Sequence, residues 1–366
     1  MNTTLVRSTI RKGLRVLVSM YSAHWCPFSC LLPVGGSGKW VIGHEMREVS
    51  CLARQLGIKI GPPWLATHGD RQSVFVGNHF DLLLSDHWLK SSHRIATAYF
   101  HGKPGHGIPE FDRCFDSLKK RHEFIHRVQV SCQSMQQVVL ASGIDPEKVH
   151  LIPIGINLEY FRQQTVESRF AARERFGVPQ DAFVVGSFQK DGNGWGEGFE
   201  PKMIKGPDVF IETMRLLKKS VKSLVVLLSG PARGYVKAGL QAVGVPYIHH
   251  QLKEYSDVGY LYQALDVYVV SSREEGGPKS VLESMASGIP LVSTRVGQAN
   301  DLVKHGENGF LADVEDANNL ARWTAHIFEK GSAILPIIEA GKVAAECNCY
   351  NAQLPLWKKF FNGFVQ

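Results

Sequence analysis

The stretch SREEGGPKSVLESMASG, residues 272–288, decides the fold of the half of the chain that contains it. It follows the apolar run of residues 266–271, which is typical of a buried strand. Pro278 suits the first position of a helix, and Gly288 suits the residue just past a helix end. The segment therefore predicts a strand, a glycine turn and a helix in succession.

Two glutamates accompany this unit, with Glu275 in the predicted turn and Glu283 inside the predicted helix. Gly276 and Gly277 let backbone N–H groups approach a ligand closely, and a helix N-terminus favours an anion. The two carboxylates can accept hydrogen bonds from hydroxyls on either side of that anion. This arrangement describes a nucleotide-sugar, with its ribose, diphosphate and hexose. The structural alternative is a capped surface helix with two solvated glutamates.

Size and composition indicate a soluble globular protein. The 366 residues suit two domains, and the contents of 44% hydrophobic and 20% charged residues are ordinary. No apolar run approaches the ~20 residues of a membrane span, and the basic residues 1–15 lack the apolar core of a signal sequence. We therefore expect a cytoplasmic location.

Cysteine content and charge narrow the possible partners. The seven cysteines are odd in number and have no zinc-ligand spacing, so neither a disulfide framework nor a zinc site is expected. The formal net charge of +7 suits a phosphate-bearing substrate or an anionic membrane surface. The basic residues are scattered and accompany no nucleic-acid-binding motif, so we expect no nucleic-acid partner.

Short apolar runs alternate with helix-length polar stretches in both halves of the chain. In the first half this pattern predicts a helix at residues 39–56 and strands at 14–19, 74–76, 82–84, 96–100, 128–130 and 149–152. In the second half it predicts helices at residues 208–219, 233–242 and 256–265 and strands at 182–187, 224–228, 247–249 and 267–270.

The alternation predicts an α/β fold made of two Rossmann-like, doubly wound domains that face a central cleft. We expect residues 1–160 to bind the acceptor and residues 161–352 to bind the nucleotide-sugar, with the junction within residues 154–175. Residues 353–366 are aromatic-rich and predict a helix that packs back on the first domain.

The glycine loops match neither common phosphate-binding motif. Around residues 35–39, Pro33 and Trp40 stand where a P-loop requires Gly and Ser or Thr, and Val41 stands where the dinucleotide pattern requires its third Gly. The run of residues 192–198 lacks that pattern as well. A nicotinamide-dependent enzyme is therefore not favoured.

Other candidate residues stand at predicted strand ends. Gly36 lets a diphosphate approach, or merely permits a tight turn. Lys190 and Lys205 stand at the two ends of the loop in one strand-loop-helix unit and can neutralise a leaving diphosphate. The alternative is that they are solvated surface lysines. Lys202 is a third candidate for the same role. His101 follows a strand and can bind a substrate hydroxyl or transfer a proton.

From about Val16 to the last helix, and most strongly from Val184 to Leu311, the chain resembles the retaining glycosyltransferases of the GT-B fold, group one or family four. The family's motif of a Glu, seven residues and a second Glu fits Glu275 and Glu283, and the adjoining LESMASGIPLVS also resembles the family. By this resemblance, the first glutamate contacts the donor sugar and the second holds the ribose.

The resemblance also assigns roles to the other candidates. Lys190 and Lys205 match the basic pair at the diphosphate, although the first of these is usually Arg, which grips a phosphate in bidentate fashion. His101 matches a histidine near the transferred sugar, and Gly36 matches the N-terminal glycine loop. Residues 297–301 depart from the usual Gly-Gly-x-x-Glu.

The reaction implied by the resemblance is transfer of a sugar from a UDP- or GDP-sugar to a hydroxyl of a glycan or lipid-linked acceptor, with retention and without a cofactor. The chain has no Asp-x-Asp pair, so we expect no metal. The expected context is cell-envelope or exported polysaccharide synthesis. The basic residues 119–121 with Arg127 suggest peripheral contact with the inner face of the plasma membrane.

Two other readings of the resemblance stay open. The altered loops and Lys190 fit a non-catalytic subunit that binds nucleotide-sugars. The chain is also compatible with another GT-B enzyme, such as an epimerase or a phosphorylase, although no separate motif supports either.

Overall fold

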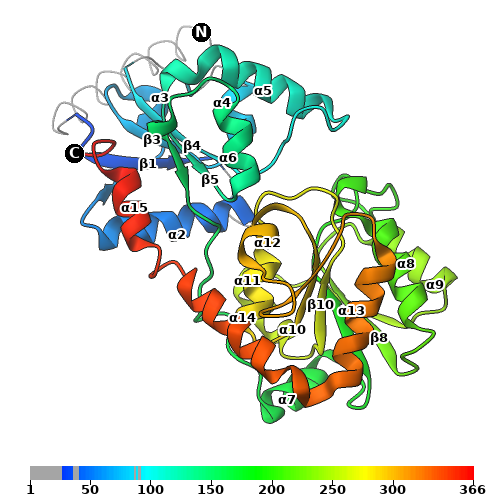
Figure 1. The fold of residues 1–366 in the computed structure, drawn as a ribbon. Helices are drawn as coiled ribbons and strands as arrows, with labels where there is room; N and C mark the ends of the chain where they lie inside the picture. The colour runs from blue at the N-terminus through cyan, green and yellow to red at the C-terminus, as the bar shows by residue number, and fades with distance from the viewer. Residues whose placement is uncertain (1–26, 36–40, 86–87, 90–91) are drawn as a thin grey trace, which may run out of the picture. The chain divides into compact units, whose positions relative to one another are not determined.

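The computed structural model describes residues 27–35, 41–85, 88–89 and 92–366. The chain divides into two compact units, Met1–Ile152 with Gln353–Gln366 and Pro153–Ala352 (Figure 1). Residues 153–160, expected in the first domain, therefore lie in the second unit. The expected junction, residues 154–175, lies there entirely.

The first unit is built on a six-stranded parallel sheet of order β2-β1-β3-β4-β5-β6. Its strands are β1 Cys30–Val34, β2 Lys59–Ile60, β3 Ser73–Val76, β4 Arg94–Tyr99, β5 Ile125–Val130 and β6 Val149–Leu151. Its helices are α2 Val41–Gln55, α3 Leu65–His68, α4 His79–Leu83, α5 Pro109–Arg121, α6 Gln133–Leu140 and α15 Leu354–Phe361, with 3-10 turns η1 His122–Phe124 and η2 Pro146–Lys148. The central strands β3 and β4 are buried along almost their whole length, as expected where a parallel sheet is covered on both faces.

Most predictions for this half are confirmed, with two differences. The run at residues 82–84 is not a strand, because the Asn78 side chain accepts a hydrogen bond from the Phe80 N–H and so caps α4, which buries Leu82 and Leu83. The strand before the glycine loop is β1, a segment for which the sequence suggested no element. The strand expected at residues 14–19 and Gly36 lie outside the described residues.

The C-terminal helix α15 belongs to the core of the first unit. Trp357 and Phe360 are buried, and their ring centroids lie 6.2 and 5.5 Å from that of Phe75 in β3. The Ser73 hydroxyl donates to the Phe364 carbonyl at 2.7 Å. The end of the chain thus covers the sheet that its first half forms.

The second unit is a six-stranded parallel sheet of order β12-β11-β10-β7-β8-β9. Its strands are β7 Phe183–Ser187, β8 Leu224–Ser229, β9 Tyr247–His250, β10 Val267–Val270, β11 Leu291–Thr294 and β12 Phe310–Ala312. Its helices are α7 Val166–Phe176, α8 Pro207–Leu217, α9 Gly234–Ala242, α10 Val258–Tyr262, α11 Lys279–Ala286, α12 Gly297–Leu302, α13 Ala317–Lys330 and α14 Leu335–Cys347, with 3-10 turns η3 Met203–Lys205, η4 Tyr255–Asp257 and η5 Gly331–Ile334. Every element predicted in this half is present.

Read from β9, the strand order of this unit is third, second, first, fourth, fifth, sixth. The chain moves outward from β7 on one side and returns to pair β10 on the other. Such a reversal opens a crevice at the carboxyl ends of the two central strands, where doubly wound sheets bind ligands. A ligand site is therefore expected in the loops that follow β7 and β10.

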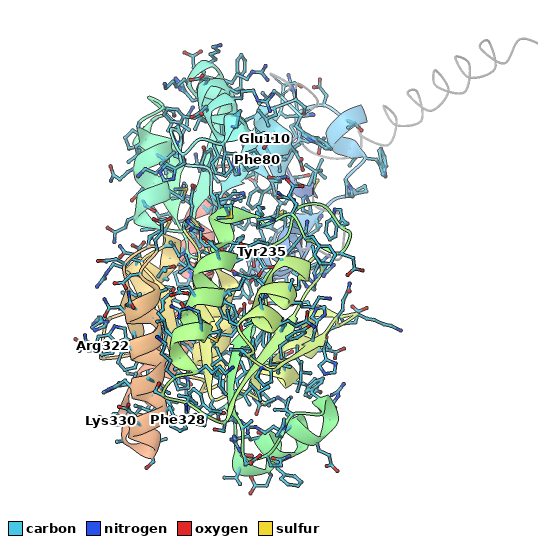
Figure 2. All side chains as sticks on the ribbon, turned by 90° about the vertical axis from the view of Figure 1, so that its right-hand side faces the viewer. Phe80, Glu110, Tyr235, Arg322, Phe328 and Lys330 are labelled. Atoms are coloured by element: carbon cyan, nitrogen blue, oxygen red, sulfur yellow. The ribbon has the colours of Figure 1, made fainter. Side chains whose placement is uncertain are left out.

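Helix α13 covers one face of this sheet. It buries Leu320 and Ile327, while Arg322 and Lys330 point outward (Figure 2). The ring of Phe328 contacts that of Phe183 in β7 at 5.1 Å between centroids.

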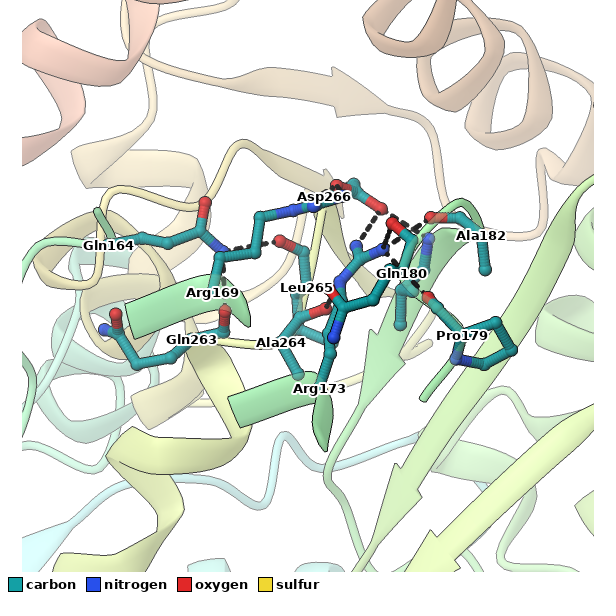
Figure 3. Close-up of polar contacts among 11 residues, drawn as sticks. Gln164, Arg169, Arg173, Pro179, Gln180, Ala182, Gln263, Ala264, Leu265 and Asp266 are labelled. Carbon is teal, nitrogen blue, oxygen red and sulfur yellow. Dashed lines mark hydrogen bonds and ion pairs between the residues drawn. The ribbon is translucent and has the colours of Figure 1, made fainter. Parts of the chain in front are cut away.

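A cluster at the start of β10 fixes α7 to the sheet (Figure 3). Asp266 accepts hydrogen bonds from the buried Arg173 at 2.6 Å, from Arg169 at 3.0 Å and from the Val184 N–H at 2.7 Å. Arg173 also donates to the carbonyl oxygens of residues 179, 180, 182 and 264. Because this cluster lies at the amino end of β10, it is structural and remote from the crevice.

Candidate functional site

The loops after β7 and β10 are in direct contact. Gly206 has φ +61°, and a Cβ there would overlap the Ser271 carbonyl oxygen. The Ser271 hydroxyl donates to the Gly206 carbonyl at 2.9 Å. Only glycine permits both the left-handed backbone and this close approach, so it sets the position of the neighbouring Lys205.

Lys205 and Glu275 meet at this contact. The lysine Nζ lies 2.5 Å from Glu275 Oε1, which also accepts a hydrogen bond from the Ser272 hydroxyl at 2.9 Å. Both side chains are partly exposed, the lysine 22% and the glutamate 13%. The structure therefore joins, in one ion pair, the residue predicted to bind the diphosphate and the residue predicted to bind the sugar.

Arg273 braces the two loops and was missed by the sequence analysis. Its guanidinium donates to both carboxylate oxygens of Asp208 at 2.7 Å and to the Met203 carbonyl at 2.8 Å. Hydrogen bonds from Arg273 hold the pKa of Asp208 below its usual range. Its position two residues before Glu275 was the only signal in the sequence.

The helix that begins beside Glu275 is largely as predicted. Pro278 is the N-cap of α11 rather than its first residue, and Gly288, with φ +71°, follows its end. A Cβ on Gly277 would lie 2.5 Å from Ile154 Cδ1, and the Gly276 carbonyl accepts from the Gln298 N–H at 2.8 Å. The glycine turn is therefore packed closely by its own unit.

Glu283 is buried and held by two tyrosines. The Tyr262 hydroxyl donates to Oε2 at 3.0 Å, and the Tyr255 hydroxyl donates to Oε1. Glu283 is 5% exposed, which excludes a solvated glutamate on a surface helix. Burial, and then the nearby Glu283 carboxylate, raise the pKa of Tyr262 well above its ordinary value. Neither tyrosine was predicted, because each comes from a different segment.

A buried cation begins the same helix. Lys279 Nζ donates to the Tyr350 hydroxyl at 3.0 Å and lies 5.3 Å from the centroid of the Tyr255 ring. Lys279 therefore lies near the ring of Tyr255, whose hydroxyl donates to Glu283. The sequence analysis had not singled out this lysine.

Lys190 and Lys202, the other predicted cations, have contacts of their own. Lys190 Nζ lies 4.2 Å from the centroid of the Trp195 ring. The backbone N–H of Lys202 donates to the Asp191 carbonyl at 2.7 Å. Asp191 pairs with the fully buried Arg233 at 3.0 Å. Desolvation raises the pKa of this carboxyl.

In the first unit, His101 follows β4 and lies among aromatic rings. Its ring centroid is 5.6 Å from that of His79, 5.3 Å from that of Phe80 and 5.8 Å from that of Phe111. Burial lowers the pKa of His79 well below its ordinary value, so that ring is neutral. No sequence pattern indicated that His79 lies beside His101.

Phe80, which is labelled in Figure 2, also lines a hollow in this unit. The hollow lies between the end of β1 and α4, which follows β3, and its lining residues are Gly35, Phe80, Asp81, Leu84, Ser85 and Trp88. The strand order reverses between β1 and β3, so the hollow occupies the ligand position of the first sheet.

Within the described ranges, no group of three or more His, Cys, Asp or Glu residues is placed to hold a metal ion. In the same part of the chain, no helix is both long enough and apolar enough to cross a membrane.

Comparison with known proteins supports the fold and gives a family match within the second unit. Residues 198–330 match the family model described as "Glycosyl transferases group 1". The fold is that of Anabaena HepE, solved in complex with UDP-glucose, with a TM-score of 0.73 at 16% identity over 91% of this chain and 99% of HepE. Residues 198–330 thus resemble the group 1 glycosyltransferases, and the chain has the GT-B fold.

Further proteins show the same likeness. A glycosyltransferase from Rickettsia africae has a TM-score of 0.67 at 17% identity, covering 92% of this chain and 99% of its own. The D-inositol 3-phosphate glycosyltransferase of Xylanimonas cellulosilytica is 29% identical over 196 residues, which are 50% of this chain and 44% of that protein. The putative glycosyltransferase EpsD of Bacillus subtilis is 28% identical over 203 residues, 54% and 50% of the two chains. The chain thus spans about half the length of the curated relatives it matches.

Proposed function

We propose that this protein transfers a hexosyl group from a nucleoside-diphosphate sugar, UDP- or GDP-linked, to an acceptor hydroxyl with retention at the anomeric carbon. The observation that carries the proposal is the position of Lys205, Glu275 and Glu283 at the carboxyl edge of β7 and β10. This is the crevice in which a doubly wound sheet binds nucleotides.

Each of the three side chains has a distinct role in the proposal. Glu283 binds the ribose hydroxyls, and Tyr255, which is only partly buried, gives up its hydrogen bond when the ribose arrives. Glu275 binds hydroxyls of the donor sugar. Lys205 leaves Glu275 and neutralises the diphosphate.

Catalysis in this scheme comes from stabilising the departing diphosphate. Its growing negative charge meets Lys205 and the backbone N–H groups at the start of α11. The reaction uses no protein nucleophile, cofactor or metal. Gly276 and Gly277 form the turn beneath the diphosphate, and Gly36 would be its counterpart in the first unit.

The acceptor side of the proposal uses the first unit. His101 hydrogen-bonds a sugar hydroxyl near the point of transfer, and the hollow beside Phe80 receives part of a glycan or lipid-linked acceptor. We place the reaction in cell-envelope or exported polysaccharide synthesis, in the cytoplasm or at the inner face of the plasma membrane. Arg127 is not available for membrane contact, because it donates to the Phe360 and Asn362 carbonyls.

The test is release of nucleoside diphosphate and formation of product from a panel of UDP- and GDP-sugars, with and without EDTA. Lys205→Met should lower turnover by about a hundredfold or more, since it removes a charge aimed at the leaving group. Glu283→Gln should weaken nucleotide binding. Lys222→Met, at an exposed lysine, and Glu307→Gln, at an exposed glutamate, are the matched controls. Unchanged turnover in both site variants would remove the site assignment, and NMR of the product's anomeric proton tests retention.

A second candidate function is a subunit that binds nucleotide-sugars without transferring them. The observation that favours it is the lysine at position 190, where the family that the chain resembles usually has Arg; its Nζ lies 4.2 Å from the centroid of the Trp195 ring. Nucleotide binding without turnover across the whole donor and acceptor panel would support this alternative.

A further inference from the structure

The loop between β7 and η3 is a braced hairpin. Gly192 and Pro201 form an antiparallel bridge, and the Asn193 N–H donates to the Glu200 carbonyl at 2.9 Å. The Asn193 side chain donates to Glu200 Oε1 at 3.1 Å. The two strands of the loop are therefore fastened together at its base.

This loop is also packed on the turn between β8 and α9. Gly198 has φ +78°, and a Cβ there would overlap the backbone of Ala232. The Gly234 N–H donates to the Glu197 carbonyl at 2.7 Å, and the Tyr235 N–H donates to the Gly198 carbonyl at 2.9 Å. Gly192 and Gly198, from the run that matched no phosphate motif, serve this close packing instead, because a Cβ on either would overlap Ala232.

The fastened loop holds two large aromatic side chains in solvent. Trp195 is 70% exposed and Phe199 is 66% exposed. Lys190 lies against the indole of Trp195 at 4.2 Å from its centroid. A braced loop that keeps two aromatic rings exposed is typical of a binding surface.

Besides Lys190, the polar side chains of the loop around these rings are acidic or carry an amide. Asn193, Glu197 and Glu200 belong to the same loop, and Glu197 is largely exposed, with Lys237 3.9 Å away. Carboxylates disfavour an anionic bilayer but accept hydrogen bonds from hydroxyls. A pyranose offers an apolar C–H face to an aromatic ring and hydroxyls around its rim, so it fits this surface.

The loop also connects directly to the donor crevice. Gln189 lies near the start of the loop, and its side chain donates to the Lys205 carbonyl at 3.0 Å. At its other end the loop leads into η3, whose last residue is Lys205. We propose that Trp195 and Phe199 form a saccharide-stacking platform that holds a pyranose unit of the acceptor. The identification of the bound saccharide as the acceptor rests on the proposed function. The affinity of the platform for saccharides can be measured without turnover.

The direct test uses protein labelled with fluorotryptophan, in which the Trp195 resonance is assigned by its loss in Trp195→Phe. Malto-, cello-, laminari-, chito- and mannohexaose are titrated in turn while fluorine NMR is recorded. At least one hexasaccharide should shift the Trp195 resonance in the wild-type protein, and Phe199→Ala should weaken that binding. If no hexasaccharide shifts it, or if only anionic phospholipid vesicles do, the proposal is wrong.

Kinetics supply the second arm, with the best acceptor found in the activity screen. Trp195→Ala should raise the acceptor KM by about tenfold, with the donor KM and kcat almost unchanged, and Trp195→Tyr should restore most of the loss. Phe170→Ala, at an exposed phenylalanine on α7, is the matched control. An unchanged acceptor KM in an active Trp195→Ala enzyme contradicts the platform alone, whereas absence of transfer by the wild-type protein contradicts the proposed function alone.

Discussion

Lys205 Nζ lies 2.5 Å from Glu275 Oε1, so the two groups assigned to the donor neutralise each other in this structure. Under the proposed function, a diphosphate has to draw Lys205 away from Glu275. A donor sugar then supplies hydroxyls to the carboxylate that has lost its lysine. The ion pair therefore opposes a bare nucleotide more than a complete nucleotide-sugar.

This relationship predicts opposite effects of one substitution on two ligands. Glu275→Gln should bind the nucleoside diphosphate about two- to fivefold more tightly, because Lys205 no longer has a competing anion, and it should bind the nucleotide-sugar more weakly. Calorimetry with both ligands makes the comparison. Glu307→Gln, in an exposed pair with Lys304, is the control and should change neither affinity. Equal weakening of both ligands would contradict the competition.

Gly206 should be far less replaceable than another glycine with similar backbone angles. A Cβ at Gly206 overlaps the Ser271 carbonyl, whereas at Gly306, with φ +78°, nothing lies within 4 Å. Gly306→Ala should cost about 1 kcal/mol of unfolding free energy from backbone strain, and Gly206→Ala clearly more, with loss of nucleotide binding. Urea denaturation and nucleotide titration of the two variants test this. Similar stabilities would show that the loop yields to the added methyl group.

Asp266 should contribute more to stability than an exposed acid. Asp266→Ala leaves the fully buried Arg173 without its carboxylate, which should cost about 3–5 kcal/mol of unfolding free energy. Asp313→Ala, which breaks an exposed pair with Arg295, should cost only about 0–1 kcal/mol. Chemical denaturation gives both values, and a small loss at Asp266 would mean that the backbone carbonyls around Arg173 suffice.

The first unit should lose stability in mild acid. Burial, together with the charges of Arg127 and Lys359, lowers the pKa of His150 to about 4, and burial also lowers the pKa of His126. A histidine with a lowered pKa binds fewer protons folded than unfolded, so its contribution is complete above about pH 6.5 and is lost as the pH falls towards 4.

The measurement is the thermal midpoint of His150→Gln and of the wild-type protein across this pH range. The variant should show the smaller loss on acidification, while His106→Gln, at an exposed histidine, should follow the wild type. Parallel curves for His150→Gln and the wild type would exclude this histidine as a source of acid sensitivity.

The two halves of the chain differ in how far the sequence predicted them. In the second half, the apolar runs are flanked by clear helix and turn signals, and every predicted element is present. In the first half, the apolar residues 82–84 lie at the end of a helix that Asn78 caps, although a strand was predicted there. The sequence before β1 has no clear signal for the start of a strand. Short apolar runs do not distinguish a strand from a buried helix, because both bury the same side chains.

The sequence by itself determined the local structure of residues 266–288, a strand, a glycine turn and a helix with Glu275 in the turn and Glu283 in the helix. Local signals suffice for that, since a cap, a helical period and a left-handed glycine act over a few residues. Only the tertiary structure decided the partners of the two glutamates. Lys205 reaches Glu275, and Tyr255 and Tyr262 reach Glu283, because packing of β10 beside β7 and of α10 against α11 joins segments whose spacing along the chain carries no signal.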